Sequence, residues 1–149
     1  MAPSQTGKRV DCPFCAIIAG EVESQIVFED EVSFAFLDKR PLFPGHCLLV
    51  PRRHYETFGD LPPELIGPLF TNAQLLSRAV EVAMKAEGSF VAINNRVSQS
   101  VPHLHVHIVP RRKKDGLKGF FWPRTPYKSE SEMEDVLRAI RAAIRSLST

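Results

Sequence analysis

Three histidines at alternate positions, His103, His105 and His107, are the residues of this sequence best suited to chemistry. In an extended strand, alternate side chains share a face and lie about 6.6 Å apart. The first and third imidazoles would then be about 13 Å apart, too far for all three to bind one metal ion easily. A neutral imidazole is a good nucleophile at about pH 7. The pattern therefore predicts a catalytic role for at least one histidine, against the alternative of a solvated strand face.

Two cysteines near the start of the chain offer a second kind of chemistry. Cys12 and Cys15 form a Cys-x-x-Cys pair, which alone is compatible with a redox pair, a zinc site or chance. A closed zinc site needs two further ligands, and the available histidines are His46, His54 and His103. A redox role is less favoured, because no thioredoxin-like strand–helix–strand unit surrounds the pair.

Short strands must position these residues. We expect strands, each bounded by turn formers, at residues 26–28, 33–37, 46–50, 90–94 and 103–109. The first two strands are joined through Glu29, Asp30 and Glu31, a tight-turn length that suggests a hairpin. Pro110 is expected to close the last strand, whose other face carries Leu104, Val106 and Ile108 against the core.

Two helices complete the expected fold. Apolar residues at helical spacing predict a long helix over 63–87, with Gly88 marking its end. Pro68 is expected to kink the first turn or to separate it. The apolar face of this helix consists of Leu65, Leu69, Ala73, Leu76, Val80 and Ala83. A second helix is expected over 131–147, opened by a Ser131–Glu134 capping box, with a face of Met133, Val136, Ile140, Ala143 and Leu147. Strands without regular strand–helix alternation predict an α+β fold with a mainly antiparallel sheet of about five strands.

Composition limits the class of protein. The 149 residues, 44% hydrophobic and 24% charged, suit one globular domain over 12–149, preceded by a disordered polar arm at 1–11 that is not a secretory signal. A net charge of +2 does not favour a nucleic-acid partner, and no apolar run has the roughly 20 residues that span a bilayer. Three cysteines favour a reducing, cytoplasmic setting over a disulfide framework, with Cys47 expected to pack as a small apolar residue.

The sequence resembles the histidine-triad (HIT) superfamily of nucleotide hydrolases and transferases. Residues 103–109 match its His-φ-His-φ-His-φ-φ signature, in which φ is hydrophobic. Further matches, over about residues 12–112, are Cys12-Pro-Phe-Cys15, Phe36-Leu-Asp38, Pro44-Gly-His46, Pro51-Arg-Arg-His54, Asn94-Asn95 and Gln99-Ser100. Residues 113–149 would be a C-terminal extension. The resemblance is to the zinc-bearing bacterial branch and implies a homodimer with a continuous sheet.

The resemblance also implies a role for each matching residue. His105 would attack the α-phosphorus of a dinucleoside polyphosphate or nucleoside phosphoramidate, which gives a nucleotidyl-histidine that water hydrolyses. His107, Gln99 and Ser100 would contact the phosphate, with Ser100 a candidate proton donor to the leaving group. The nucleoside would meet Asp38 at the ribose, Asn94 at the sugar or phosphate, and a base pocket of Ile18, Phe28 and Leu37. The zinc ligands would be Cys12, Cys15, His54 and His103.

Two features depart from the family pattern: the segment Arg96-Val-Ser98, and Pro102 immediately before His103. Arg96-Val-Ser98 stands where relatives commonly have a longer, glycine-bearing loop, which motivates a nucleotide-binding regulatory protein with little catalysis as the alternative function. A hydrolase that uses zinc-bound water is less favoured, because four protein ligands leave no open position. The basic run Arg111–Lys114 is either a solvated surface or a polyphosphate site. Phe120, Phe121 and Trp122 either cap a partner's pocket or pack within the chain.

Overall fold

The structure is a computed structural model that describes residues 11–117 and 124–148. The chain divides into one compact unit that ends at Asp115 and a second that begins at Gly116. The first unit contains the helices α1 (Pro13–Ile18), η1 (Phe58–Asp60) and α2 (Pro63–Met84) and the strands β1 (Ile26–Glu29), β2 (Ser33–Leu37), β3 (Cys47–Pro51), β4 (Gly88–Ala92) and β5 (Val106–Arg111). The second unit contains α3 (Glu130–Leu147). Residues 1–10 of the expected arm, and Phe120, Phe121 and Trp122, lie outside the described residues.

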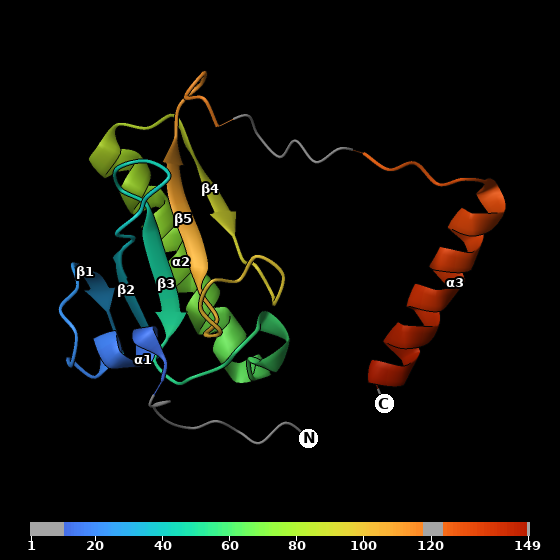
Figure 1. The fold of residues 1–149 in the computed structure, drawn as a ribbon, viewed down its shortest axis with the longest axis horizontal. Coiled ribbons are helices and arrows are strands. Elements are labelled where there is room, and N and C mark those ends of the chain that lie inside the picture. Colours follow the sequence, from blue (N-terminus) through green and yellow to red (C-terminus); the bar gives the residue numbers. More distant parts are fainter. Residues whose placement is uncertain (1–10, 118–123, 149) are drawn as a thin grey trace. The chain divides into compact units, whose positions relative to one another are not determined.

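The five strands form one antiparallel sheet in the order β1-β2-β3-β5-β4, which confirms the expected fold class (Figure 1). The β1–β2 pair is the expected hairpin. Its three-residue turn is held by Asp30, whose Oδ1 accepts the Val32 and Ser33 N–H groups at 2.9 and 2.8 Å. The pairing of β3 with β5 places Cys47 opposite Ile108 and Leu48 opposite His107, and β5, which carries His107, lies between β3 and β4.

Strand alternation sends side chains to two different faces of the sheet. One face packs against α2, in a core that includes Ala35, Leu49, Leu76, Val106 and Ile108. The other face packs against α1, in a second core cluster of Cys12, Phe14, Cys15, Phe34, Phe36, Leu48 and Val50. Because His107 is the cross-strand partner of Leu48, it belongs to the α1 face.

The helix α2 is one continuous helix through Pro68, not a split one. Its buried residues include the expected Leu69, Ala73, Leu76 and Val80, whereas Ala83 is exposed. The helix ends at Met84 and not at Gly88. Lys85 already adopts the left-handed conformation, with φ of 52°, and its N–H bonds back to Glu81 and Val82. Gly88 is the first residue of β4 instead.

The histidine segment is only partly a strand, which corrects the expected range 103–109. β5 begins at Val106, because the Leu104 N–H bonds to the Tyr55 carbonyl at 2.6 Å and the His103 N–H to the Val101 carbonyl at 2.8 Å. These bonds tie residues 103–104 to the segment around Tyr55 and not to a strand ladder. Pro110 does not close the strand, which continues to Arg111; at Pro110 only β4 pairs with β5, and β3 has already ended.

The helix α3 begins one residue earlier than expected, and its cap lies two residues earlier. Ser129 is the N-cap, and its Oγ accepts the Glu132 N–H at 3.1 Å. Ser129 and Ser131 are each followed by a glutamate three residues later, so the pattern alone fits both. The expected apolar face is present, and Met133, Ile140 and Leu147 are exposed.

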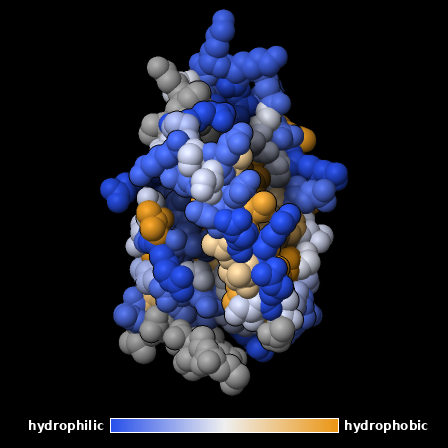
Figure 2. Space-filling view, turned by 90° about the vertical axis from the view of Figure 1, so that its right-hand side faces the viewer, coloured by the Kyte–Doolittle hydropathy of each residue, from blue (hydrophilic) through white to orange (hydrophobic). Residues whose placement is uncertain are grey.

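On the face drawn in Figure 2, hydrophilic side chains cover most of the area and hydrophobic ones form small groups. Within the described ranges, no helix has the length and hydrophobicity that crossing a membrane requires.

Candidate functional site

Four buried side chains meet where α1 approaches the segments before β5 and after β3. They are Cys12, Cys15, His54 and His103, and one ligand atom from each lies within 4.8 Å of the others. Cys12 Sγ is 3.4 Å from His103 Nδ1, and Cys15 Sγ is 3.4 Å from His54 Nδ1. Two thiols and two imidazoles are a donor set that zinc prefers. The cluster can hold a metal ion, and it unites the four residues that the sequence analysis named.

The Cys-x-x-Cys spacing works here because it spans one turn of a short helix. Cys12 is the N-cap of α1, with Pro13 in the first turn, and its Sγ accepts the Cys15 N–H at 3.4 Å. Cys15 therefore lies about one turn above Cys12, on the same side. The helix α1 was not expected from the sequence, because six residues are too few for an apolar repeat. The N-cap followed by proline was the available signal.

The ring of His103 is oriented for a metal. Its Nε2–H donates to the Pro51 carbonyl at 3.0 Å, so the lone pair of the neutral ring is on Nδ1, the atom that faces the thiols. Burial lowers the pKa of His103 to about 4, which keeps the ring neutral at neutral pH. A hydrogen bond from the far nitrogen to a carbonyl is the usual support of a metal-bound histidine. The residues present thus fit zinc.

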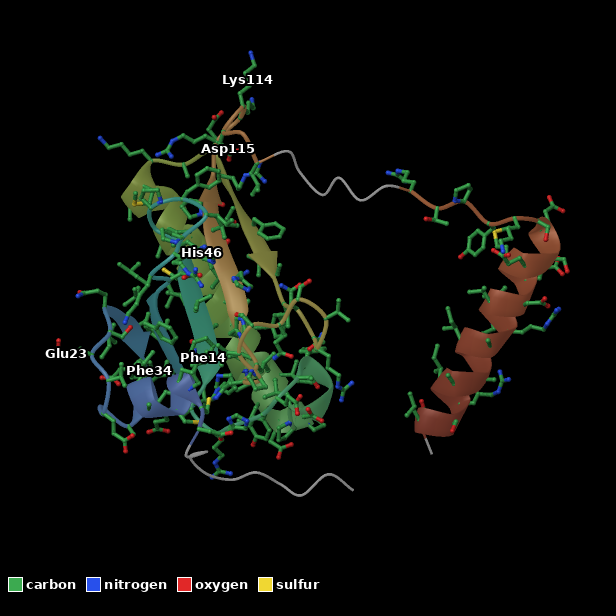
Figure 3. The ribbon with its side chains drawn as sticks, viewed as in Figure 1. Phe14, Glu23, Phe34, His46, Lys114 and Asp115 are labelled. Carbon is green, nitrogen blue, oxygen red and sulfur yellow. The ribbon has the colours of Figure 1, made fainter. Side chains whose placement is uncertain are left out.

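The central histidine, His105, is held in one tautomer. It is only 3% exposed, and its Nδ1–H donates to the His103 carbonyl at 2.7 Å. In the neutral ring the lone pair is therefore on Nε2, for which the described residues supply no hydrogen-bond partner. The ring of Phe14 packs edge-on against His105, with 5.2 Å between ring centroids (Figure 3 labels Phe14). A fixed imidazole with a free lone pair is suited to nucleophilic attack.

His107, on β5, lies beside His105, with 4.9 Å between ring centroids. Burial, with the neighbouring rings of His105 and His46, lowers the pKa of His107 to about 4. Its Nδ1 is 3.0 Å from the Nε2 of His46, a buried residue just before β3. The sequence identifies His46 only as a possible ligand and a family landmark. Alternation with Leu48 and Val50 was a signal for its face, but the partner depends on the register of β3 with β5.

The loop before the histidine segment is held by its own side chains. Gln99 Oε1 accepts the Arg96 N–H at 2.8 Å, and Gln99 Nε2 donates to the Glu56 carbonyl at 2.7 Å. Arg96 and Ser98 adopt φ of 64° and 60°, where glycine is the usual residue. Asn94 and Ser100 are exposed. The structure thus places Gln99 and Ser100 next to the histidine segment, with the amide of Gln99 bonded both within the loop and to Glu56, which follows β3.

The residues expected around the nucleoside are not all brought together. Asp38 follows β2, and its Oδ2 is 3.7 Å from His46 Nε2. Asp38 and Leu37 line a cavity of about 400 Å³ with Glu23, Ser24, Gln25 and Lys39. Ile18 packs on the α1 face, whereas Phe28 packs against the core cluster on the α2 face, because it pairs with Ala35. Ile18, Phe28 and Leu37 therefore do not form one wall.

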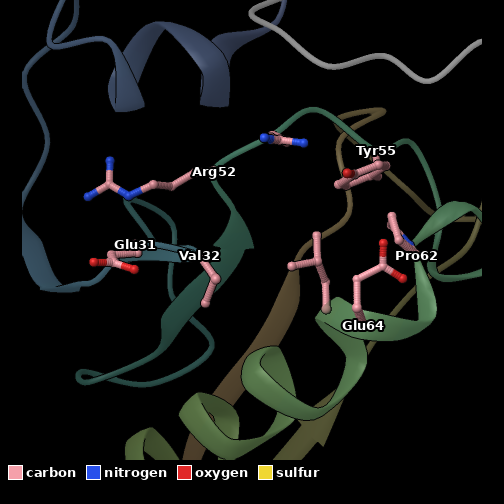
Figure 4. A pocket seen from close by; sticks show the side chains of 8 residues that line it. Glu31, Val32, Arg52, Tyr55, Pro62 and Glu64 are labelled. Carbon is pink, nitrogen blue, oxygen red and sulfur yellow. The ribbon is translucent and has the colours of Figure 1, made fainter.

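A second cavity, of about 230 Å³, contains none of the predicted site residues (Figure 4). Its walls carry both signs of charge, from Glu31, Arg52, Arg53 and Glu64.

The basic run after β5, Arg111–Lys114, forms a turn. In this turn Arg111 pairs with Asp115 at 2.6 Å, and the Lys113 N–H donates to Glu87.

Comparison with known proteins fits this geometry. A model of the HIT domain family matches residues 19–114. The chain belongs to the HIT family. The matched range contains the sheet, α2 and the histidine segment, so the HIT domain is the part of the chain that positions His105 and His107.

Curated relatives of this HIT domain include three named enzymes. The chain is 31% identical to adenylylsulfatase HINT3 of Arabidopsis thaliana, over 92% of this chain and 71% of the relative. It is 38% identical to an asymmetrical bis(5'-nucleosyl)-tetraphosphatase of Schizosaccharomyces pombe, over 63% of this chain and 53% of the relative. It is 37% identical to adenosine 5'-monophosphoramidase HNT1 of Saccharomyces cerevisiae, over 71% and 66%.

Solved structures share the fold. SMU.412c from Streptococcus mutans has a TM-score of 0.83 and 33% identity, over 93% of this chain and 88% of that one. A zinc-bound histidine triad family protein from Mycobacterium smegmatis has a TM-score of 0.69 and 36% identity, over 92% and 97%. The HIT fold of this chain is thus shown by sequence and by structure.

Proposed function

We propose that this protein is a nucleotide hydrolase that cleaves at an α-phosphate through a nucleotidyl group bound to His105. Its substrates are dinucleoside polyphosphates or nucleoside phosphoramidates. In the first step His105 Nε2 forms a bond to phosphorus, and the bond from phosphorus to the leaving group breaks. In the second step water displaces the histidine and releases a nucleoside monophosphate.

The observation that carries the proposal is the hydrogen bond between His105 Nδ1–H and the His103 carbonyl, at 2.7 Å. It leaves the Nε2 lone pair of the neutral ring free, and it fixes the ring in the orientation of attack. Fixing a nucleophile removes much of the entropic cost of reaching the transition state.

Other residues would stabilise and orient the phosphate. Nucleotidyl transfer depends mainly on positioning and on stabilising charge on the phosphate oxygens. In the proposal His107 Nε2–H donates to a non-bridging oxygen, Gln99 and Ser100 contact the phosphate, and Ser100 protonates the leaving group. Asp38 accepts the ribose hydroxyls, with Asn94 near the sugar or phosphate. The base then occupies the cavity beside Asp38, for which Leu37 supplies an apolar wall.

The names of the curated relatives support a nucleotide phosphate as the shared part of the substrate. They describe enzymes for an adenylyl sulfate, a bis(5'-nucleosyl) tetraphosphate and an adenosine phosphoramidate. These compounds differ in the group attached to the nucleotide phosphate. We therefore propose attack at that phosphate. Experiment must identify the leaving group.

Zinc is the metal proposed for the Cys12–Cys15–His54–His103 cluster. Two observations support it: the donor set of this chain, and a zinc-bound relative with 36% identity. Bound zinc would supply a structural tie between α1 and the histidine segment. His103 would then hold the nucleophile through its carbonyl group while its ring serves the metal.

A homodimer with a continuous sheet is also part of the proposal. β4 and β1 are the two edges of the sheet, and the register of β1 is interrupted between Ile26 and Phe28, so β4 is the more regular edge. Pairing of β4 with a second copy would continue the sheet across the dimer. Sedimentation equilibrium should give about twice 16.7 kDa. Val91→Lys, which charges an exposed residue of β4, should lower that mass; a wild-type mass of one chain would refute the dimer.

A substrate panel tests the proposed function. Adenosine and guanosine phosphoramidates, dinucleoside polyphosphates and adenylyl sulfate are incubated with wild-type protein, and nucleoside monophosphate is measured. We expect rapid release of the monophosphate from at least one class, because the proposed nucleophile, His105, lies beside His107, the proposed hydrogen-bond donor to the phosphate. Tight binding of AMP by calorimetry, with no product from any substrate, would instead favour the regulatory alternative.

A further inference from the structure

The imidazole of His46 is built into the site although it is not one of the three alternating histidines. The residue is 3% exposed and precedes β3, after Gly45, whose φ is +98° (Figure 3 labels His46). A Cβ at Gly45 would lie 2.7 Å from the Met84 side chain, so the chain passes close to α2 here. His46 Nε2 is 3.0 Å from His107 Nδ1.

The proton on His46 can be assigned from its other neighbour. The Leu42 N–H points at His46 Nδ1, at 3.0 Å. A backbone N–H can only donate, so Nδ1 must hold a lone pair, and the neutral ring carries its proton on Nε2. That proton is then directed at His107 Nδ1. His107 Nδ1 therefore accepts, and the proton of the neutral His107 ring is on Nε2.

Both rings are neutral at neutral pH. Burial is the largest cause that lowers the pKa of His46 and the pKa of His107, the latter to about 4. The carboxylate of Asp38, 3.7 Å from His46 Nε2, acts in the opposite direction but is the smaller effect. Neutral rings make the assignment of donor and acceptor definite, because each has one N–H and one lone pair.

A metal site is the competing interpretation of the same cluster. Asp38, His46 and His107 each offer one ligand atom within 4.8 Å of the others. A metal ion on His46 Nε2 would need the lone pair there, which moves the proton to Nδ1. Two N–H donors, from Leu42 and from His46, would then face each other at 3.0 Å. The backbone thus opposes a metal ion and favours a chain of hydrogen bonds.

We propose that His46 is a positioning residue that locks His107 in the tautomer with its proton on Nε2. The Leu42 backbone fixes His46, and His46 fixes His107. His107 then presents an N–H, not a lone pair, towards the site; the described residues supply no partner for that atom. The inference rests on the proposed function only in naming phosphate as the acceptor. Without the lock, part of the His107 population would offer phosphate oxygen a lone pair, which repels it.

Nitrogen-15 NMR of labelled protein at neutral pH reads the tautomer directly, without substrate. Three variants are compared with wild type. His46→Phe keeps an aromatic ring but has no donor, and His46→Gln restores an amide donor. Cys47→Ala is the matched control, because it alters a buried neighbour outside the hydrogen-bond chain. Zinc content and melting temperature are recorded for each.

We expect His107 to carry its proton on Nε2 in the wild-type, His46→Gln and Cys47→Ala proteins. In His46→Phe we expect a mixture of the two His107 tautomers. The kcat of His46→Phe should fall about 10- to 100-fold with AMP affinity little changed, and His46→Gln should recover part of it. A wild-type His107 protonated on Nδ1, or an unchanged tautomer and kcat in His46→Phe, would overturn the proposal. If His46→Phe does not fold, the His107 tautomers of the wild-type and His46→Gln proteins test the proposal instead. Absence of turnover in wild type would refute the hydrolase function, whatever the tautomer shows.

Discussion

Replacing His105 with Ala is expected to lower kcat by at least about three orders of magnitude on any nucleotide that the protein cleaves. The reason is specific to this ring. Its Nδ1–H is bound to the His103 carbonyl at 2.7 Å, so only Nε2 can attack. The His103 ring also donates to a carbonyl, that of Pro51, but its lone pair faces the thiols. His107 cannot replace His105, because its Nδ1 faces His46. Single-turnover assays of wild type and variant, side by side, give the ratio.

The folded state of the variant must be shown separately, since His105 is buried. Zinc content, melting temperature and AMP affinity serve that purpose. The four side chains of the metal cluster, His103 included, are unchanged in His105→Ala, so the metal should remain bound. A folded, metal-bearing His105→Ala protein with more than about 1% of wild-type activity would show that another group attacks phosphorus.

Loss of the metal is expected to be the second large effect. Cys15→Ser should abolish stoichiometric zinc binding and lower the melting temperature by about 10 °C or more, because a closed four-ligand site contributes directly to folding. The cluster is buried and ties α1 to two distant segments, so the loss of one ligand leaves three segments poorly held together. Metal analysis of purified protein and thermal unfolding, with and without a strong chelator, measure both effects.

The third cysteine is the natural control. Cys47 is as buried as Cys15, but it lies in the core cluster on the α2 face, outside the metal cluster. Burial raises the pKa of its thiol, which suits a packing role. Cys47→Ala should therefore keep a full complement of zinc and lose only packing energy, about 1 kcal/mol. Wild-type protein that purifies without metal and unfolds at the same temperature with or without chelator would refute the zinc site.

Much of the site could be predicted because it depends on local patterns. The alternation of His103, His105 and His107 with aliphatic residues predicted a histidine face, and the hairpin and α2 followed from turn residues and helical spacing. The histidine segment, residues 103–109, departs from a regular strand at its start, where long-range hydrogen bonds replace pairing with a neighbouring strand. Residues 103–104 bond to the segment around Tyr55, and this places His103 beside His54. No pattern within residues 103–109 contains that information.

The remaining features depend on register and on backbone conformation. His46 reaches His107 because Leu48 pairs with His107, and a shift by one residue would turn His46 to the other face. The same alternation separates Phe28 from Ile18. Arg96 and Ser98 adopt left-handed conformations that their residue types do not suggest, so the shape of the loop before His103 could not be predicted from its sequence.

Mass spectrometry of the working protein tests the nucleotidyl-histidine intermediate most directly. The p-nitrophenyl ester of AMP has a good leaving group, so hydrolysis of the intermediate becomes the slow step. Samples quenched during turnover are digested without exposure to acid and sequenced. We expect an AMP group on His105 and on no other residue of the wild-type protein, and none on His105→Ala. An AMP group on a different residue, or unmodified protein throughout rapid turnover, would contradict it.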